Sequence, residues 1–185
     1  MNQGLGHHYL VDTITTFRAY KKLAESALDQ LQDEEYFITL DGESNSIAVI
    51  IQHLSGNMLS RWTNFLTEDG EKDWRQRDDE FESHDYSKQQ LIDIWNKGWD
   101  CLLNELDSLT EADLLKTVYI RKEPLSAIDA ITRQVAHYSY HVGQIVYIGR
   151  IIKNENWKNL SIPKHASKQY NQSAEVKDPA KNFSR

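Results

Sequence analysis

The sequence predicts an all-α fold, built as a four-helix bundle. Four long segments repeat apolar residues every three or four positions, the spacing that lines one face of an α-helix. The 185-residue chain contains only three prolines, and none of them interrupts these segments. Four helices of roughly 20 to 27 residues each are typical of a helix bundle.

The first two predicted helices cover residues 8–31 and 46–66. Leu10 and Phe17 belong to the apolar stripe of the first helix. A serine or asparagine just before Ile47 can cap the second helix, whose stripe continues through regularly spaced isoleucine, leucine and tryptophan residues. The sequence Thr-Glu-Asp-Gly then predicts its end.

The third and fourth predicted helices cover residues 87–106 and 126–152. Ser87 and Gln90 form the capping-box pattern at the start of the third helix, in which two side chains satisfy backbone N–H groups. The fourth helix has a regular apolar stripe that begins near Ile131.

Two connections and a C-terminal tail complete the predicted organisation, with the bundle in residues 1–155. The connection of residues 64–83 is long for a bundle, which is typical of functional loops or lids. Val118–Ile120 could form a short extended piece. The polar, lysine-rich tail of residues 156–185 is expected to be irregular and to pack on the bundle or extend from it.

The composition argues against several classes of function. A net charge of −7 and the lack of a basic stripe argue against nucleic-acid binding. No apolar run approaches the ~18 residues needed to span a bilayer, and the polar first residues do not resemble a signal peptide. The single cysteine, Cys101, cannot form an internal disulfide, which is typical of a reducing compartment. We therefore expect a cytoplasmic protein with a small-molecule substrate and no membrane partner.

Two histidines one helical turn apart, His137 and His141, are the strongest chemical signal. Residues four positions apart in a helix share a face with their Cβ atoms ~6 Å apart, so both imidazoles can bind one divalent ion. His53 lies beside the apolar stripe of the second helix, and a bundle can place it opposite the pair. We predict a metal site formed by these three residues. The alternative is three core histidines satisfied by hydrogen bonds.

Three neutral nitrogen ligands would leave the other coordination positions of the ion to water or substrate, as in catalytic zinc sites. Such a ligand set suits zinc, nickel, copper or iron. The sequence identifies no catalytic residue. Glu71 and Glu80 could act as bases, but they lie in an acidic run, where carboxylates are usually solvated.

Three further residues are candidates for substrate binding or for support of the ligands. Asn57 and Arg61 follow His53 at four-residue intervals and share its helix face. Arg61 could bind a substrate carboxylate or, instead, the acidic segment of residues 68–82. Gln144 could accept a hydrogen bond from a ligating histidine, or it could be a plain surface glutamine.

The order of the three histidines resembles the DinB-like superfamily, also described as YfiT-like metal-dependent proteins. The resemblance covers roughly residues 8–155. It is carried by the phrases Gln52-His53-Leu54, Ser108-Leu109-Thr110-Glu111-Ala112-Asp113 and His137-Tyr138-Ser139-Tyr140-His141-Val142-Gly143-Gln144-Ile145. The stretch from Arg61 to Arg75 and the phrase Leu160-Ser161-Ile162-Pro163-Lys164 further resemble a branch of undefined function.

The resemblance implies a four-helix bundle, often dimeric, that holds zinc, nickel or a similar divalent ion on three histidines. Some members of the superfamily are thiol-dependent enzymes, including transferases that join bacillithiol or mycothiol to electrophiles. We therefore expect a homodimeric, metal-dependent enzyme of the transferase or hydrolase type that activates a low-molecular-weight thiol or water. The alternative is a non-catalytic binding or sensor protein that the metal stabilises.

Overall fold

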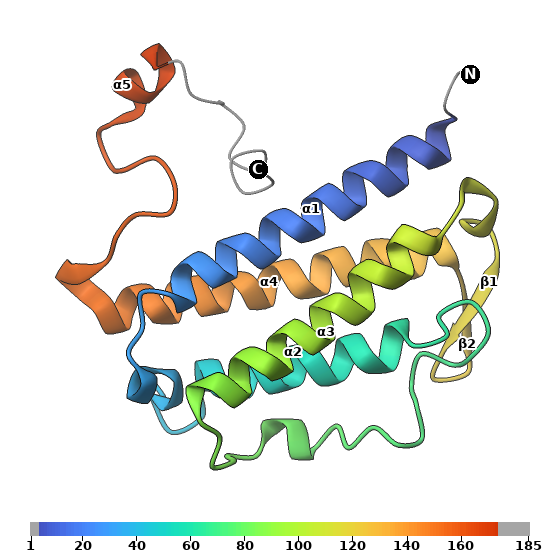
Figure 1. The fold of residues 1–185 in the computed structure, drawn as a ribbon, viewed down its shortest axis with the longest axis horizontal. Helices are drawn as coiled ribbons and strands as arrows, with labels where there is room; N and C mark the ends of the chain where they lie inside the picture. Colours follow the sequence, from blue (N-terminus) through green and yellow to red (C-terminus); the bar gives the residue numbers. More distant parts are fainter. Residues whose placement is uncertain (1–3, 174–185) are drawn as a thin grey trace.

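The computed structural model describes residues 4–173, and this part of the chain forms the predicted all-α fold (Figure 1). Its four long helices are α1 (Leu5–Leu28), α2 (Ile47–Trp62), α3 (Lys88–Ser108) and α4 (Ala127–Lys153). α1 packs mainly against α4, and α2 packs mainly against α3. Within the described residues, no helix combines the length and the hydrophobicity needed to cross a membrane.

The directions of α2 and α3 explain the long connection between them. Figure 1 shows that both helices run the same way, so the chain that leaves α2 must return along the bundle before α3 begins. The 16 residues of α2 span about 24 Å. The returning segment, residues 63–87, includes the short 3-10 helix Asp79–Phe81, which packs against α2. We call residues 63–87 the crossover loop.

Serine side chains cap the three helices that carry or flank the histidines. The hydroxyls of Ser46 and Ser87 accept hydrogen bonds from backbone N–H groups in the first turns of α2 and α3, as predicted. Gln90 completes the capping box at Ser87. Ser126 caps α4 in the same way.

The predicted end of the second helix is too late by four residues. α2 ends at Trp62, because Thr63 is extended and Asn64 adopts the left-handed conformation, with φ of 51°. Asparagine tolerates this conformation better than most residues, and it stops the helix before Leu66. The chain can therefore turn into the crossover loop earlier than the apolar spacing indicated.

The predicted extended piece is one half of a small hairpin. Strand β1 (Thr117–Ile120) pairs antiparallel with β2 (Glu123–Ser126), with Val118 opposite Leu125. Strand β2 was not predicted, because it contains Pro124 and proline is rare in strands. The hairpin lies at the end of the bundle where α2 and α3 finish (Figure 1).

An aromatic cluster joins the four helices at the core. Phe17 of α1, Trp62 of α2, Trp99 of α3 and Tyr138 of α4 are all fully buried. The ring of Phe17 contacts the other three, with centroid separations of 5.8 to 6.4 Å. Such edge-to-face and tilted arrangements stabilise the packing beyond simple area burial.

The tail that was predicted to be irregular contains one short helix. After α4, the backbone of Lys158 exchanges two hydrogen bonds with the Gln30 side chain, which holds this part against the bundle. The helix α5 (Ser167–Gln172) lies beyond the bundle in Figure 1. The rest of the predicted tail, residues 174–185, falls outside the described residues.

Candidate metal centre

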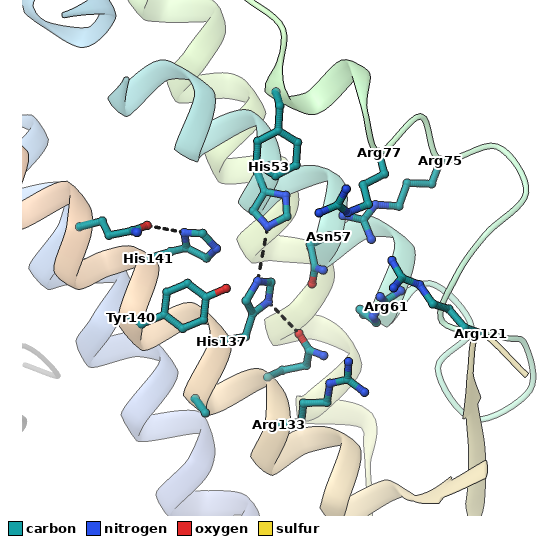
Figure 2. A pocket seen from close by; sticks show the side chains of 14 residues that line it. His53, Asn57, Arg61, Arg75, Arg77, Arg121, Arg133, His137, Tyr140 and His141 are labelled. Atoms are coloured by element: carbon teal, nitrogen blue, oxygen red, sulfur yellow. Dashed lines mark hydrogen bonds between the residues drawn. The ribbon is translucent and has the colours of Figure 1, made fainter. Parts of the chain in front are cut away.

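Three histidines meet beside the crossover loop (Figure 2). His53 comes from α2, whereas His137 and His141 come from successive turns of α4. The Nε2 atoms of His53 and His137 are 3.4 Å apart. One ligand nitrogen from each of the three rings lies within 4.8 Å of the other two. The structure thus brings together the three residues singled out in the sequence, and they could hold one metal ion.

Each of these histidines has an oxygen acceptor next to its Nδ1 atom. The pairs are His53 with Glu80 (3.0 Å), His137 with Gln134 (3.4 Å) and His141 with Gln144 (2.7 Å). An acceptor at this position favours the tautomer that carries its proton on Nδ1, which leaves the Nε2 lone pair free. Metal-binding histidines usually have such a partner. All three rings are therefore oriented as ligands.

The Nε2 atom of His141 provides a test of this assignment. It is buried and has no hydrogen-bond partner among residues 4–173, which is costly unless another group satisfies it. Two nitrogens bound tetrahedrally to one zinc ion lie about 3.3–3.4 Å apart. The separation between His53 and His137 matches that spacing. A divalent ion fits these donors, and hydrogen bonds within the protein alone do not account for His141.

Burial keeps two of the three imidazoles neutral. Desolvation, together with the neighbouring His141 and His53, lowers the pKa of His137 to about 3. Desolvation also lowers the pKa of His141 to about 4, although its hydrogen bond with Gln144 acts in the opposite direction. Both rings are thus unprotonated near neutral pH, the form that binds metal.

Glu80 was expected to be solvated, but it is buried beside His53 at the candidate site. Its side chain is only 10% exposed. The carboxylate accepts hydrogen bonds from Arg75 Nε at 2.7 Å and Arg75 Nη2 at 2.8 Å, besides the bond from His53. Burial raises the pKa of Glu80, but the hydrogen bonds and charges of His53 and Arg75 outweigh it and lower the pKa below the usual range. Glu80 is therefore a charged, fixed carboxylate that orients His53.

A glycine on α2 makes room for this carboxylate. A Cβ atom at Gly56 would overlap the carboxylate of Glu80, with the Cδ atom only 2.6 Å away. Real Cβ atoms do not approach other heavy atoms so closely, and Glu80 is held by two other side chains. The crossover loop can reach His53 because α2 has no side chain at this position.

The histidines border a cavity of about 670 Å³. Asn57, Arg61 and Gln144, the three candidate neighbours from the sequence, all line it. The crossover loop contributes Arg75 and Arg77 to the wall, as the length of this loop suggested. Small-molecule sites commonly have volumes of about 300–1,000 Å³, so the cavity can hold a small molecule as well as an ion.

A hydrogen-bond chain from the core holds Asn57. The buried Trp62 donates a hydrogen bond from Nε1 to the Tyr138 hydroxyl, and that hydroxyl donates one to Asn57 Oδ1. Both donor–acceptor distances are 3.0 Å. Because its oxygen is occupied in this way, the side chain of Asn57 has one fixed orientation at the cavity wall.

Arg61 binds the crossover loop. Its guanidinium donates hydrogen bonds to the backbone oxygen of Gly70 and to the carboxylate of Glu71. The distance to the Glu71 carboxylate is 3.0 Å. The side chain is 7% exposed, and desolvation lowers its pKa although the charge of Glu71 opposes this. Of the two roles left open for Arg61, the structure shows the contact with the acidic loop.

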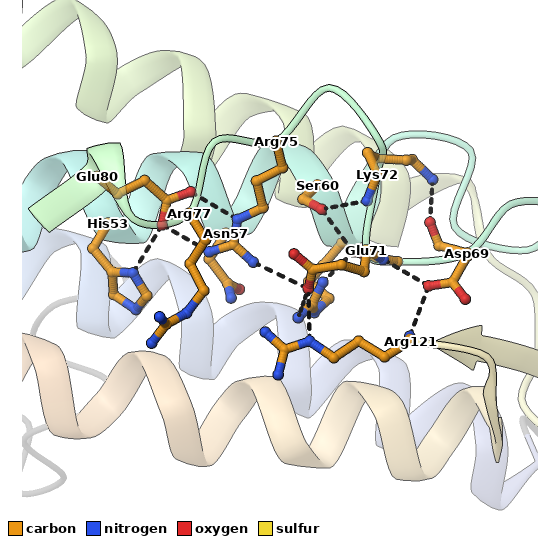
Figure 3. A network of polar contacts seen from close by, with 12 residues as sticks. His53, Asn57, Ser60, Asp69, Glu71, Lys72, Arg75, Arg77, Glu80 and Arg121 are labelled. Atoms are coloured by element: carbon orange, nitrogen blue, oxygen red, sulfur yellow. Dashed lines mark hydrogen bonds and ion pairs between the residues drawn. The ribbon is translucent and has the colours of Figure 1, made fainter.

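Glu71 links several arginines and is not solvated as the acidic run suggested (Figure 3). Besides Arg61, its carboxylate contacts Arg75 Nη1 at 3.5 Å and Arg121 Nε at 3.1 Å. Burial raises the pKa of Glu71, but the hydrogen bond and charge of Arg61, with the other two arginines, lower it overall. This network ties the crossover loop to α2 and to the hairpin.

Several residues of the cavity wall escaped the sequence analysis. Gln134 precedes His137 by three positions, just as Gln144 follows His141 by three, so helical spacing was an available signal. Arg121 also lines the cavity, but no local pattern marked it, because the hairpin brings it there.

Comparison with known proteins gives a family but no activity. A family model described as "Protein of unknown function (DUF1572)" matches residues 4–166, a range that includes the four long helices and the three histidines. A search of curated proteins and a search of solved structures found no match. The chain therefore belongs to the DUF1572 family of proteins of unknown function.

Proposed function

We propose that this protein is a metal-dependent enzyme of the transferase type that activates a low-molecular-weight thiol. His53, His137 and His141 would hold a divalent ion, zinc or nickel. The observation that carries the proposal is the convergence of three oriented imidazoles at the wall of a cavity large enough for a small molecule. When bound there, such an ion makes a coordinated thiol or water more acidic.

The cavity favours a catalytic role over a purely structural one. Structural zinc sites are closed by four protein ligands, whereas catalytic sites use three and keep a position open. Among residues 4–173, the group of candidate ligands comprises three histidines, and all three border the cavity. This arrangement argues for the enzyme over the metal-stabilised binding protein.

The lining residues favour a thiol over water as the activated group. Metal-dependent hydrolases often use a carboxylate as general base, such as the glutamate of helical zinc proteases. No aspartate or glutamate of the described residues lines this cavity. Glu80 lies behind His53 with both oxygens occupied and a lowered pKa, which makes it a poor base. A thiol needs less help, because it is far more acidic than water.

The protein's own residues would then position the reactants. Glu80, Gln134 and Gln144 fix the three rings through their Nδ1 atoms, and the core holds Asn57 at the cavity wall. The resemblance to the DinB-like superfamily supports the thiol, since some of its members are thiol-dependent transferases. The second substrate would be an electrophilic small molecule.

Elemental analysis of gently purified protein tests the metal site. We expect about one zinc or nickel ion per chain, and we expect His53→Ala to lose most of it. His84→Ala is a matched control, because His84 lies on the crossover loop and does not line the cavity. Wild-type protein with no bound metal, or equal metal content in His53→Ala, would refute the site.

Cobalt substitution tests for an open position. The visible absorption of Co²⁺-loaded protein should change when a low-molecular-weight thiol is added, because a thiolate ligand alters the spectrum. A panel of thiols, with the matching alcohols as controls, would rank the cosubstrates. A spectrum that no thiol changes would favour the non-catalytic, metal-stabilised protein.

A further inference from the structure

Five arginines of the described residues line the cavity beside the histidines. They are Arg61, Arg75, Arg77, Arg121 and Arg133. These residues come from α2, the crossover loop, the hairpin and α4, so the tertiary structure gathers them. The chain as a whole has a net charge of −7, yet no carboxylate of the described residues lines this cavity. A positive cavity in an acidic protein attracts anions selectively.

Two of these arginines are neutralised, and three remain available. Arg61 and Arg75 are buried and bind Glu71 and Glu80, as described above. Arg121 forms a hydrogen bond with Glu71 through Nε alone, which leaves its terminal nitrogens without a hydrogen-bond partner among residues 4–173.

The other two available arginines have still weaker contacts. The Arg133 side chain makes no hydrogen bond or ion pair with the described residues, and it lines the cavity from α4. The Arg77 guanidinium has one ion pair, of 3.4 Å with the fully exposed Asp78, and such surface pairs are weak. It also lies over the Phe81 ring, 5.1 Å from the ring centroid, a contact that leaves its N–H donors free. Three guanidinium groups thus have free donors at this site.

The backbone around Arg121 is strained in a way that places this residue. Arg121 and Lys122 form the hairpin turn, and both adopt positive φ values, 57° and 67°. Glycine or asparagine is the usual choice in such a turn. The carboxylate of Asp69 accepts hydrogen bonds from both backbone N–H groups, at 2.8 and 2.6 Å, and so holds the turn. Strain of this kind is concentrated at functional sites.

The three available arginines surround the same space. In Figure 2, Arg77, Arg121 and Arg133 extend toward the side of the histidine cluster where Asn57 lies. Figure 3 shows the guanidinium groups of Arg77 and Arg121 on the α4 side of the carboxylate network. A cavity of about 670 Å³ is far larger than an ion with a few waters, each of which occupies about 30 Å³. The space therefore suits a molecule with an anionic group beside the metal site.

We propose that Arg77, Arg121 and Arg133 form an oxyanion-binding subsite, which holds a carboxylate or phosphate group of the substrate next to the three histidines. Guanidinium groups bind both oxyanions through paired, charge-assisted hydrogen bonds, and lysine would not reproduce this geometry. The inference that this anion is part of the substrate rests on the proposed function. The anion binding itself does not require the metal.

Isothermal titration of the full chain, as purified, with inorganic phosphate and with succinate tests the subsite. Wild-type protein should bind at least one of the two anions. The double variant Arg121→Gln/Arg133→Gln should bind it at least tenfold more weakly. Arg150→Gln is a matched control, because Arg150 is an exposed arginine of α4 outside the cavity. Tighter binding of phosphate would identify a phosphorylated substrate, and tighter binding of succinate would identify a carboxylate.

Two further measurements keep the test decisive. Arg133→Gln alone removes no hydrogen bond or ion pair within the described residues, so its weaker binding supports the subsite even if the double variant fails to fold. The zinc and nickel contents of the same samples separate this inference from the proposed function. Arginine-dependent anion binding without bound metal would refute only the proposed function. Bound metal without arginine-dependent anion binding, or no binding of either anion, would overturn the subsite.

Discussion

Glu80 is the carboxylate that holds one member of the histidine cluster, His53. It accepts a hydrogen bond from His53 on one side and binds Arg75 on the other, so that its charge is balanced while its position is fixed. Carboxylates placed behind ligating histidines orient the ring and raise its basicity. The arrangement at His53 is therefore typical of a metal centre.

Glu80→Gln tests this role. The substitution keeps the size of the side chain but removes its charge, so we expect the affinity for Zn²⁺ to fall roughly 10- to 100-fold. Competition titration with a chromophoric chelator measures this affinity. Glu82→Gln, an exposed position on the same loop, should match the wild type. Equal affinity in Glu80→Gln would mean that His53 does not depend on this carboxylate.

Arg61 illustrates a charged residue whose main contacts are structural. Its guanidinium is buried against Gly70 and Glu71, so its loss would leave that carboxylate and backbone oxygen with fewer partners. We expect Arg61→Ala to lower the free energy of unfolding by about 1.5–3 kcal/mol, the range for charged hydrogen bonds. Arg18→Ala, which breaks an exposed ion pair with Asp107, should cost less than about 1 kcal/mol.

Urea denaturation measures both effects, and elemental analysis should show unchanged metal content in Arg61→Ala. Unaltered stability together with weaker anion binding would instead assign Arg61 to substrate binding.

At the scale of elements, ion pairs tie the crossover loop to its neighbours. Its carboxylates reach α2 through Arg61 and the hairpin through Arg121. Asp69 adds backbone hydrogen bonds to the hairpin turn. The position of the loop, and with it one wall of the cavity, should therefore depend on pH.

Glu71→Gln tests this dependence. The folded-state pKa of Glu71 lies below its ordinary value of 4.5, so the unfolded chain binds the proton more readily. The stabilisation from Glu71 is complete above that value and is lost as the pH falls through the folded-state pKa. Urea denaturation should show wild type more stable than Glu71→Gln at pH 7, with the difference shrinking below about pH 4.5. A difference that does not change with pH would exclude this role.

For the whole molecule, the exposed side of α4 is a candidate surface for self-association. Tyr147 and Ile151, one turn apart, are 64% and 42% exposed. Large apolar side chains gathered on one face commonly mark an interface. The homodimer expected from the sequence would bury this face.

Light scattering at micromolar concentration tests the dimer. We expect a dimeric mass for the wild type and a monomeric mass for Ile151→Glu, because a charge at a buried interface is strongly unfavourable. Leu115→Glu is the control, since Leu115 is exposed elsewhere, near the hairpin. A monomeric mass for the wild type would contradict the prediction.

Location in the cytoplasm stays a prediction from the single cysteine.

The sequence by itself determined the features that depend on neighbouring residues. Helical periodicity predicted the four long helices, and capping residues predicted the starts of α2 and α3, because both signals act within a few positions of the chain. The spacing of His137 and His141 placed them on one face for the same reason. His53 required one more step, the assumption that a bundle packs α2 opposite α4.

Only the tertiary structure decided what surrounds these histidines. Glu80 and Arg121 lie in a loop and a turn without periodicity, so nothing local predicted that they reach the cavity. Their positions depend on ion pairs between residues far apart in sequence and on the parallel course of α2 and α3, which sends the loop back along the bundle. In the sequence, a carboxylate that pairs with a distant arginine or histidine cannot be told from a solvated one, because only the folded chain brings the partner close.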